Sequence, residues 1–218
     1  MPRLLTKDDV VGIFPPVCSP FTKDEEVDTA ALKREVDYNI ELGVTGVCVG
    51  GSTGEGHALD AQDLGTLVKA AQEVANGRVP VMAGIITTST REAVKKAKVA
   101  RDAGAQCLMI TPPIYQICSD DGVYDFYSTI HKESGLPTMV YNVLTNAPVT
   151  VPLMQRMAAN QKETGLIATK ESIGGSLETL TALLDTIGDK ISVTWAHDWL
   201  LYPGLAIGAT GSVSGAAA

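Results

Sequence analysis

The sequence is poor in the residues that mark several classes of protein. Aromatic residues make up 5% of the 218 residues, so the core has to be built mostly from Val, Ile, Leu and Ala. The three histidines show no H-x-x-x-H spacing and the four cysteines form no C-x-x-C pair, which argues against a metal site and against a disulfide framework. We therefore expect the cysteines to be reduced and to serve as small apolar side chains.

Basic charge and long apolar runs are also scarce. The formal net charge is −8, and the one locally basic segment, "REAVKKAKVARDAG", is typical of a solvated helix face, so a nucleic-acid partner is not expected. No apolar run reaches membrane-spanning length, and the opening "MPRLLTKDDV" lacks the apolar centre of a signal peptide. The sequence predicts no membrane partner, and a cytoplasmic location is the default expectation.

Short apolar, β-branched runs alternate with helical patterns along the chain. Helical spacing is seen at Leu32, Val36 and Ile40, and the strand-like runs are apolar along their whole length, which suits a parallel sheet covered on both faces. Eight such units predict an α/β fold, a (β/α)8 barrel formed as one domain by residues 1–218, with an open doubly wound sheet as the rival. The eight runs are "VVGIFPPV", "TGVCVG", "VPVMAGI", "QCLMITP", "PTMVYN", "GLIATK", "ISVTWA" and "TGSVSG".

The chain stops at "GSVSGAAA", directly after the eighth run. The helix that should cover this strand is absent, and a barrel without it is expected to expose apolar strand surface. Either a partner covers that surface or the chain is a fragment of a longer one. We favour the fragment, a barrel that lacks its last helix and any helical extension.

The stretch "VGGSTGEGH", from Val49 to His57, follows the second strand-like run and allows three chemistries. A nucleotide P-loop would continue with Lys and Ser or Thr, and this loop does not. The G-x-S-x-G string fits a nucleophile elbow with Ser52 as nucleophile, followed in order by Asp185 and His197. The third possibility is a carboxylate cradle, in which glycine N–H groups and hydroxyls bind an anion.

Lys170 and Tyr141 end the sixth and fifth strand-like runs. Burial at a strand end favours the uncharged lysine amine, which attacks ketones to form a Schiff base. A phenol one strand away is placed to pass protons to the substrate. Each residue alone also fits an ordinary rim position, but together with Ser52 and Thr53 they converge on the carboxyl ends of the strands, the catalytic face of a barrel.

The strings "GGSTGE", "TPPIY", "YNV" and "TKES", in this order and spacing, resemble the dihydrodipicolinate synthase / N-acetylneuraminate lyase family over nearly the whole chain. The resemblance implies a (β/α)8 barrel, usually assembled as a tetramer of two tight dimers. It implies a class I aldolase that acts on pyruvate or a related 2-oxo acid and an aldehyde. No metal or organic cofactor is implied, because the iminium itself is the electron sink.

The resemblance also implies a catalytic role for four residues. Lys170 matches the Schiff-base lysine and Tyr141 matches the proton-shuttling tyrosine. Thr53 matches the threonine that links this tyrosine into a relay. Tyr115 matches a tyrosine that some members lend across the dimer to a neighbour's site.

Substrate-binding positions carry over less completely. Gly51, Ser52 and Thr53 match the loop that holds the 2-oxo acid carboxylate, and Val213 matches a position whose carbonyl lines the pocket. Asn146 stands where dihydrodipicolinate synthases have an arginine for the carboxylate of the second substrate, and asparagine lacks the charged bidentate fork.

The last departure follows the seventh run. Asp198 is kept, but Trp199 replaces the acid with which neuraminate lyases bind sugar hydroxyls. Trp199 indicates a second substrate that is smaller or more apolar. Its alternative role is packing against the next helix. We therefore predict an enzyme that condenses or cleaves a 2-oxo acid and an aldehyde through a lysine enamine. Dihydrodipicolinate synthase proper, a serine hydrolase using Ser52 and an inactive barrel remain as alternatives.

Overall fold

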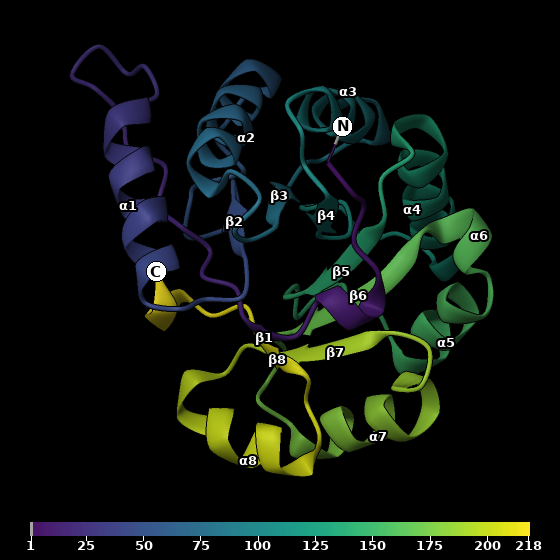
Figure 1. The fold of residues 1–218 in the computed structure, drawn as a ribbon. Coiled ribbons are helices and arrows are strands. Elements are labelled where there is room, and N and C mark those ends of the chain that lie inside the picture. The colour runs from purple at the N-terminus through teal and green to yellow at the C-terminus, as the bar shows by residue number, and fades with distance from the viewer. Residues whose placement is uncertain (1) are drawn as a thin grey trace.

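The computed structural model describes residues 2–218, and its centre is a sheet of eight parallel strands in the order β1-β8-β7-β6-β5-β4-β3-β2. Because β2 to β8 follow one another in the sheet in chain order and β1 pairs with β8, the open doubly wound alternative, whose strand order reverses, is excluded. Figure 1 shows the helices as a ring around the strands. The predicted (β/α)8 barrel is confirmed.

The strands are short and the helices supply most of the ordered chain. The strands are β1 Gly12–Ile13, β2 Val47–Val49, β3 Val81–Ile85, β4 Cys107–Ile110, β5 Thr138–Asn142, β6 Leu166–Glu171, β7 Ser192–Trp195 and β8 Gly211–Ser212. The helices are α1 Thr29–Glu41, α2 Ala61–Ala75, α3 Thr90–Asp102, α4 Asp120–Ser134, α5 Val151–Ala159, α6 Gln161–Thr164, α7 Leu177–Ile187 and α8 Leu201–Ile207. Three short 3-10 helices are η1 Lys7–Asp9, η2 Asp198–Leu200 and η3 Gly215–Ala217.

The two ends of the strand order are joined by backbone hydrogen bonds from the segment that follows β1. Thr45 N donates to Ile13 O at 2.9 Å, and Cys48 N donates to Pro15 O at 3.0 Å. Val17 N in turn donates to Cys48 O at 3.0 Å. These bonds close the sheet on itself, which leaves no unpaired edge between β1 and β2.

The helices begin where the sequence provides an N-cap. Asp60 accepts from the backbone N–H of Gln62 and Asp63 ahead of α2, and Thr150 accepts from Leu153 ahead of α5. A side-chain oxygen in this position satisfies an N–H that the helix leaves without a partner. Local sequence therefore sets the starts of these helices before any tertiary contact forms.

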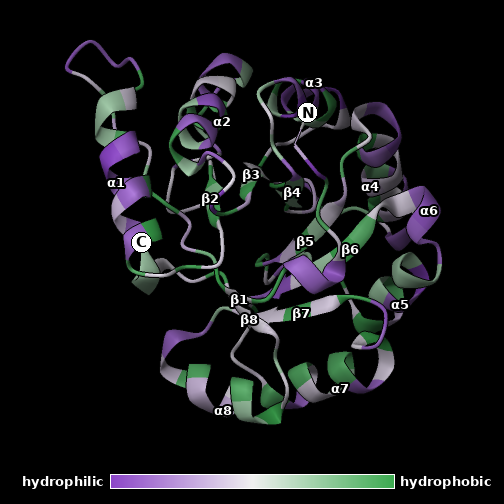
Figure 2. Cartoon of the chain, viewed as in Figure 1, coloured by the Kyte–Doolittle hydropathy of each residue, from purple (hydrophilic) through white to green (hydrophobic). Residues whose placement is uncertain are grey.

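Two apolar clusters divide the core. The inner cluster lies inside the barrel and collects alternate residues from the strands, among them Cys48, Met82, Met109, Tyr141 and Val213. The outer cluster contains the intervening strand residues and the buried faces of the helices. In Figure 2 the outer helices carry both hydrophilic and hydrophobic residues, as helices with one buried face do.

The eighth strand is more enclosed than the sequence suggested. Val213 is 0% exposed and Ser212 is 1% exposed, so the expected bare strand surface is absent and this expectation was wrong. Exposed apolar side chains are found instead on neighbouring segments, with Leu42 directly after α1 at 64% and Leu205 of α8 at 43%. In the view of Figure 1 the C-terminal residues lie between these two helices.

Two residues do not lie where the sequence placed them. Cys18, expected to serve as a small apolar side chain, is exposed, whereas Cys48 and Cys107 are buried, and all four cysteines are free thiols. Lys96, expected on a solvated face of α3, is only 4% exposed. Its side chain turns toward the neighbouring loop and not toward solvent.

Candidate active site

Lys170 and Tyr141 lie side by side at the carboxyl ends of β6 and β5. They are register partners in the parallel ladder, so their side chains leave the sheet on the same face. Each is 5% exposed, and Lys170 Nζ lies 4.0 Å from the centroid of the Tyr141 ring. The sequence predicted two rim residues with related roles, and the fold places them in direct contact inside the barrel.

Cys48 of β2 and Gly51 of the loop after β2 lie near this pair. Burial raises the pKa of the Cys48 thiol to about 12, and the nearby charge of Lys170 acts in the opposite direction. A side chain built at Gly51 would lie 4.0 Å from Cys48 Sγ and 3.2 Å from Met109 Cε. The backbone of the glycine loop therefore faces the same interior space as the amine of Lys170.

The loop from Gly50 to Gly56 is packed against its own backbone. Gly56 N donates to Gly51 O at 2.9 Å, and a side chain at Gly56 would lie 1.9 Å from Gly50 O. Gly84 of β3 packs against this loop. A side chain at Gly84 would lie 2.2 Å from the same Gly50 oxygen, so there is no space for one. The glycines are thus required by close backbone approach, and they present Ser52 and Thr53 at an exposed tip.

Lys96 supports the return arm of this loop. Its Nζ donates to Gly56 O at 3.3 Å, and burial lowers the pKa of the ammonium group. Sequence reasoning missed this residue because its helix is locally basic and reads as solvated. The apolar spacing of Ala93, Ala97 and Ala100, with Lys96 on the same buried face, was the signal that places it.

The C-terminal segment completes the wall of the site. Val213 belongs to the same inner cluster as Tyr141. The next residue, Ser214, donates a hydrogen bond to Asp198 Oδ1, and Gly215 lies close enough that a side chain there would be 3.5 Å from Thr53 Oγ1. Val213, Asp198 and Thr53 are therefore brought to one side of the barrel mouth.

Tyr115 and Asn146 lie farther out. Tyr115 is 87% exposed, in a left-handed backbone conformation with φ 78°, on the loop after β4. Asn146 lines a cavity of about 190 Å³ together with that loop. Among residues 2–218 no hydrogen bond joins Thr53 to Tyr141, so the predicted relay stays a prediction.

The hydrolase alternative finds no support in the geometry. His197 is 7% exposed, and its Nε2 accepts the backbone N–H of Gly175 at 3.1 Å. Asp185 is exposed on α7. Within residues 2–218 neither side chain is hydrogen-bonded to the other or to Ser52, so no Ser–His–Asp arrangement is formed.

His197 predicts a pH dependence of stability. Burial lowers its pKa below the ordinary value, with Asp198 acting in the opposite direction, so the folded protein binds fewer protons here than the unfolded chain. The contribution of the neutral ring to the free energy of unfolding is therefore fully present above the pKa that His197 has in the unfolded chain. It is lost as the pH falls toward the pKa that His197 has in the folded protein. We expect the urea midpoint to fall between about pH 7.5 and about pH 5.5.

The matched variant for this prediction is His197→Gln, which can still accept the Gly175 N–H but does not titrate. Its urea midpoint should change less with pH than that of the wild-type protein. An equal change in both proteins would show that another group causes the dependence.

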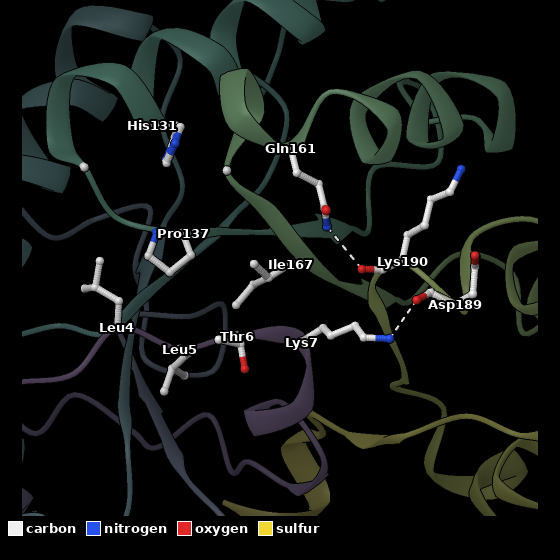
Figure 3. A pocket seen from close by; sticks show the side chains of 12 residues that line it. Leu4, Leu5, Thr6, Lys7, His131, Pro137, Gln161, Ile167, Asp189 and Lys190 are labelled. Carbon is white, nitrogen blue, oxygen red and sulfur yellow. Dashed lines mark hydrogen bonds between the residues drawn. The ribbon is translucent and has the colours of Figure 1, made fainter.

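A larger cavity of about 640 Å³ lies at the opposite end of the barrel, where β5 and β6 begin (Figure 3). Leu4, Leu5, Pro137 and Ile167 line its apolar part, and Lys7 Nζ donates to Asp189 O at 2.7 Å on its rim. None of the predicted site residues lines it. Because barrel active sites lie at the carboxyl ends of the strands, this cavity is not the candidate site.

Neither metal-ligating clusters nor membrane-spanning helices occur in residues 2–218. No group of three or more His, Cys, Asp and Glu side chains in this range is arranged to hold a metal ion. In the same range, each helix is too short or too polar to pass through a bilayer.

Comparison with known proteins identifies the family. The model of the dihydrodipicolinate synthetase family matches residues 9–218, which is nearly the whole chain. The chain belongs to this family.

A relative and two solved structures illustrate the similarity within the dihydrodipicolinate synthetase family. The 4-hydroxy-tetrahydrodipicolinate synthase of Pelobacter propionicus is 34% identical over 203 residues, which cover 93% of this chain and 69% of the relative. The crystal structure of dihydrodipicolinate synthase DapA-2 from Bacillus anthracis has a TM-score of 0.88 at 30% identity, covering 95% of this chain and 70% of that one. YagE, a prophage protein of the same family from E. coli K12 in complex with pyruvate, has a TM-score of 0.88 at 28% identity, with the same coverage of 95% and 70%.

Proposed function

We propose that this chain is a class I aldolase that binds pyruvate or a related 2-oxo acid as an imine of Lys170. One observation carries the proposal: the amine of Lys170 is buried inside the barrel and lies 4.0 Å from the ring of Tyr141. A lysine buried without a carboxylate partner is costly unless its amine has a chemical use. The pyruvate bound by the related YagE supports the choice of 2-oxo acid.

The proposed reaction starts with attack of the Nζ lone pair on the ketone carbon. The resulting carbinolamine loses its hydroxyl as water after protonation, which leaves a cationic iminium. Loss of a proton from the adjacent carbon gives a neutral enamine, whose carbon attacks the aldehyde carbonyl, and the aldehyde oxygen takes up a proton. Hydrolysis of the iminium consumes one water and returns the free amine. Tyr141 is the group placed to carry protons in these steps.

The glycine loop is proposed to hold the carboxylate of the 2-oxo acid. Its tip carries the hydroxyls of Ser52 and Thr53, and Gly51 faces the interior beside Cys48. Backbone N–H groups and hydroxyls are suited to carboxylate oxygens, and the missing lysine after the loop argues against a phosphate. Val213 of the inner cluster is proposed to line the same pocket.

The second substrate is proposed to be an aldehyde without a carboxylate. The cavity beside Asn146 is lined by apolar groups such as Pro112, Ile117 and Pro148, and its only charged side chain is that of Asp120. A carboxylated aldehyde would meet no cation there. Dihydrodipicolinate synthase proper is the alternative, supported by the names of the similar relatives.

Asn146→Arg tests the second substrate. The new guanidinium would offer a charge-assisted, bidentate partner, and we expect kcat/KM for a carboxylated aldehyde to rise by roughly 10-fold or more. Asn146→Gln, which lengthens the side chain without adding charge, should leave kcat/KM for the carboxylated aldehyde unchanged. Efficient turnover of the carboxylated aldehyde by the wild-type protein would favour the synthase alternative.

Tyr115 supports a proposed homo-oligomer. Its side chain is 87% exposed although it is a large aromatic group, and Ile117 on the same loop is 71% exposed. Exposed aromatic and aliphatic side chains of this kind are typical of protein interfaces. A second copy of the chain, as a dimer or tetramer, is the proposed partner.

Borohydride trapping tests the main proposal. Incubation with pyruvate and borohydride, followed by peptide mass mapping, should place a reduced adduct on the peptide that contains Lys170. A fluorophosphonate label on Ser52 would instead support the hydrolase. Absence of both labels would favour an inactive barrel.

A further inference from the structure

The residues that follow Tyr141 and Lys170 form a buried network of their own. Asn142 and Glu171 are the last residues of β5 and β6 and are register partners, directly after the Tyr141–Lys170 pair. Because strand side chains alternate, they point away from the barrel interior. Asn142 is 3% exposed and Glu171 is 0% exposed.

Every contact of the Glu171 carboxyl group is with an N–H donor. Asn142 Nδ2 donates to Oε2 at 2.8 Å, and Ile173 N donates to Oε1 at 2.9 Å. Burial raises the pKa of this carboxyl group, and these donors act in the opposite direction. No ion pair of residues 2–218 involves it. A carboxylate offers one acceptor oxygen to each of these two donors.

Asn142 links the same carboxylate to the loop after β5. Its Oδ1 accepts from Val149 N at 2.9 Å, and its Nδ2 donates to Val149 O at 3.1 Å as well as to Glu171. The backbone adds a bond from Ser172 N to Asn142 O at 3.0 Å. The two strand ends and the loops that leave them are therefore tied together immediately beyond the reacting pair.

We infer that Glu171 is a positioning residue for imine formation, and that through Asn142 it fixes the distance between the amine of Lys170 and the phenol of Tyr141. This inference rests on the proposed function. A displacement of about 1 Å between reacting groups can cost roughly 100-fold in rate, and the network is placed to prevent such a displacement. It does not touch the loop at Gly51, so it acts on the reacting groups and not on the carboxylate cradle.

Glu171→Gln is the direct test. A carboxamide has to turn its NH2 toward either Asn142 Nδ2 or the N–H of Ile173, so one donor meets another donor. We expect the maximal rate of borohydride-trapped adduct formation with pyruvate to fall by roughly 10- to 100-fold. The pyruvate concentration that gives half of the maximal rate should change less than about 2-fold. A loss of pyruvate-binding contacts worth about 1.4 kcal/mol would instead raise it about tenfold.

Two further variants complete the test. Glu171→Gln combined with Asn142→Asp reverses the polarity of the bond and should recover part of the lost rate. Thr164→Val is the matched control, because Thr164 is 0% exposed and hydrogen-bonded to Met157 O and Asn160 O at the other end of β6. It should lower stability without slowing adduct formation. Where Glu171→Gln does not fold, Glu171→Asp, which keeps the charge but is too short to reach Asn142, should show the same slowing.

The outcomes are distinct. An unchanged maximal rate in a folded Glu171 variant overturns the inference, as does equal slowing by Thr164→Val. No adduct on Lys170 in the wild-type protein overturns the proposed function itself and this inference with it.

Discussion

Replacing Lys170 by Met should abolish the pyruvate adduct and lower turnover by about 10⁴-fold or more, since its amine is the proposed nucleophile that forms the covalent intermediate. The fold should persist. Lys170 is 5% exposed and has no carboxylate partner among the ion pairs of residues 2–218, and Met is an apolar side chain of similar length. Peptide mapping after borohydride, kcat and a thermal melt are the measurements.

Lys96→Met is the control for this result, because Lys96 is the other buried lysine. It is 4% exposed and burial lowers its pKa, so burial alone does not distinguish it from Lys170 as a nucleophile. Its Nζ, however, is bonded to Gly56 O outside the barrel interior. Lys96→Met should retain the adduct. If the adduct forms in Lys170→Met but not in Lys96→Met, Lys96 is the nucleophile.

Gly84→Ala should be a strongly damaging small substitution near the site. The new methyl group would lie 2.2 Å from Gly50 O and 2.7 Å from Gly51 N, and these backbone atoms cannot move aside as a flexible side chain would. Overpacking of this kind costs about 1–3 kcal/mol of stability. Because the displaced atoms belong to the proposed carboxylate loop, the pyruvate concentration for half-maximal trapping should also rise, by roughly tenfold.

Gly122→Ala provides the comparison for Gly84→Ala. Gly122 lies in the first turn of α4, and a side chain there would meet its nearest atom, Ser119 Oγ, at an ordinary 3.4 Å. Exchange of a helical glycine for alanine should stabilise the protein by up to about 1 kcal/mol and leave trapping unchanged. Gly84→Ala with a wild-type melting temperature and wild-type trapping would contradict the role given to this contact.

Lys170 and Tyr141 could be predicted from the sequence because the pattern that indicates them is local. A lysine and a tyrosine that end successive apolar runs fall at the same edge of any parallel sheet, whatever the packing outside it. The contact between Lys170 and Tyr141 follows from their equal positions in β6 and β5. The catalytic roles given to them remain a proposal.

The environment of other residues, such as Glu171 beside this pair, could not be predicted from the sequence in the same way. Glu171 reads as an ordinary charged residue after a strand, and only its register with Asn142 shows that both are buried and bonded. Cys18 shows the opposite error, since it follows an apolar run and is nevertheless exposed. In each case the environment is set by a segment far away in the chain.

By itself, the sequence determined the strand and helix pattern, the N-caps at Asp60 and Thr150, and the convergence of the glycine loop, Tyr141 and Lys170 at one end of a barrel. These features depend on periodicity and on capping chemistry within a few residues. The tertiary structure alone decided that Lys96 is buried, that Gly84 has no room for a methyl group and that Asn142 holds Glu171. Each of those facts depends on which distant backbone or side chain closes the space, and a linear pattern carries no such distance.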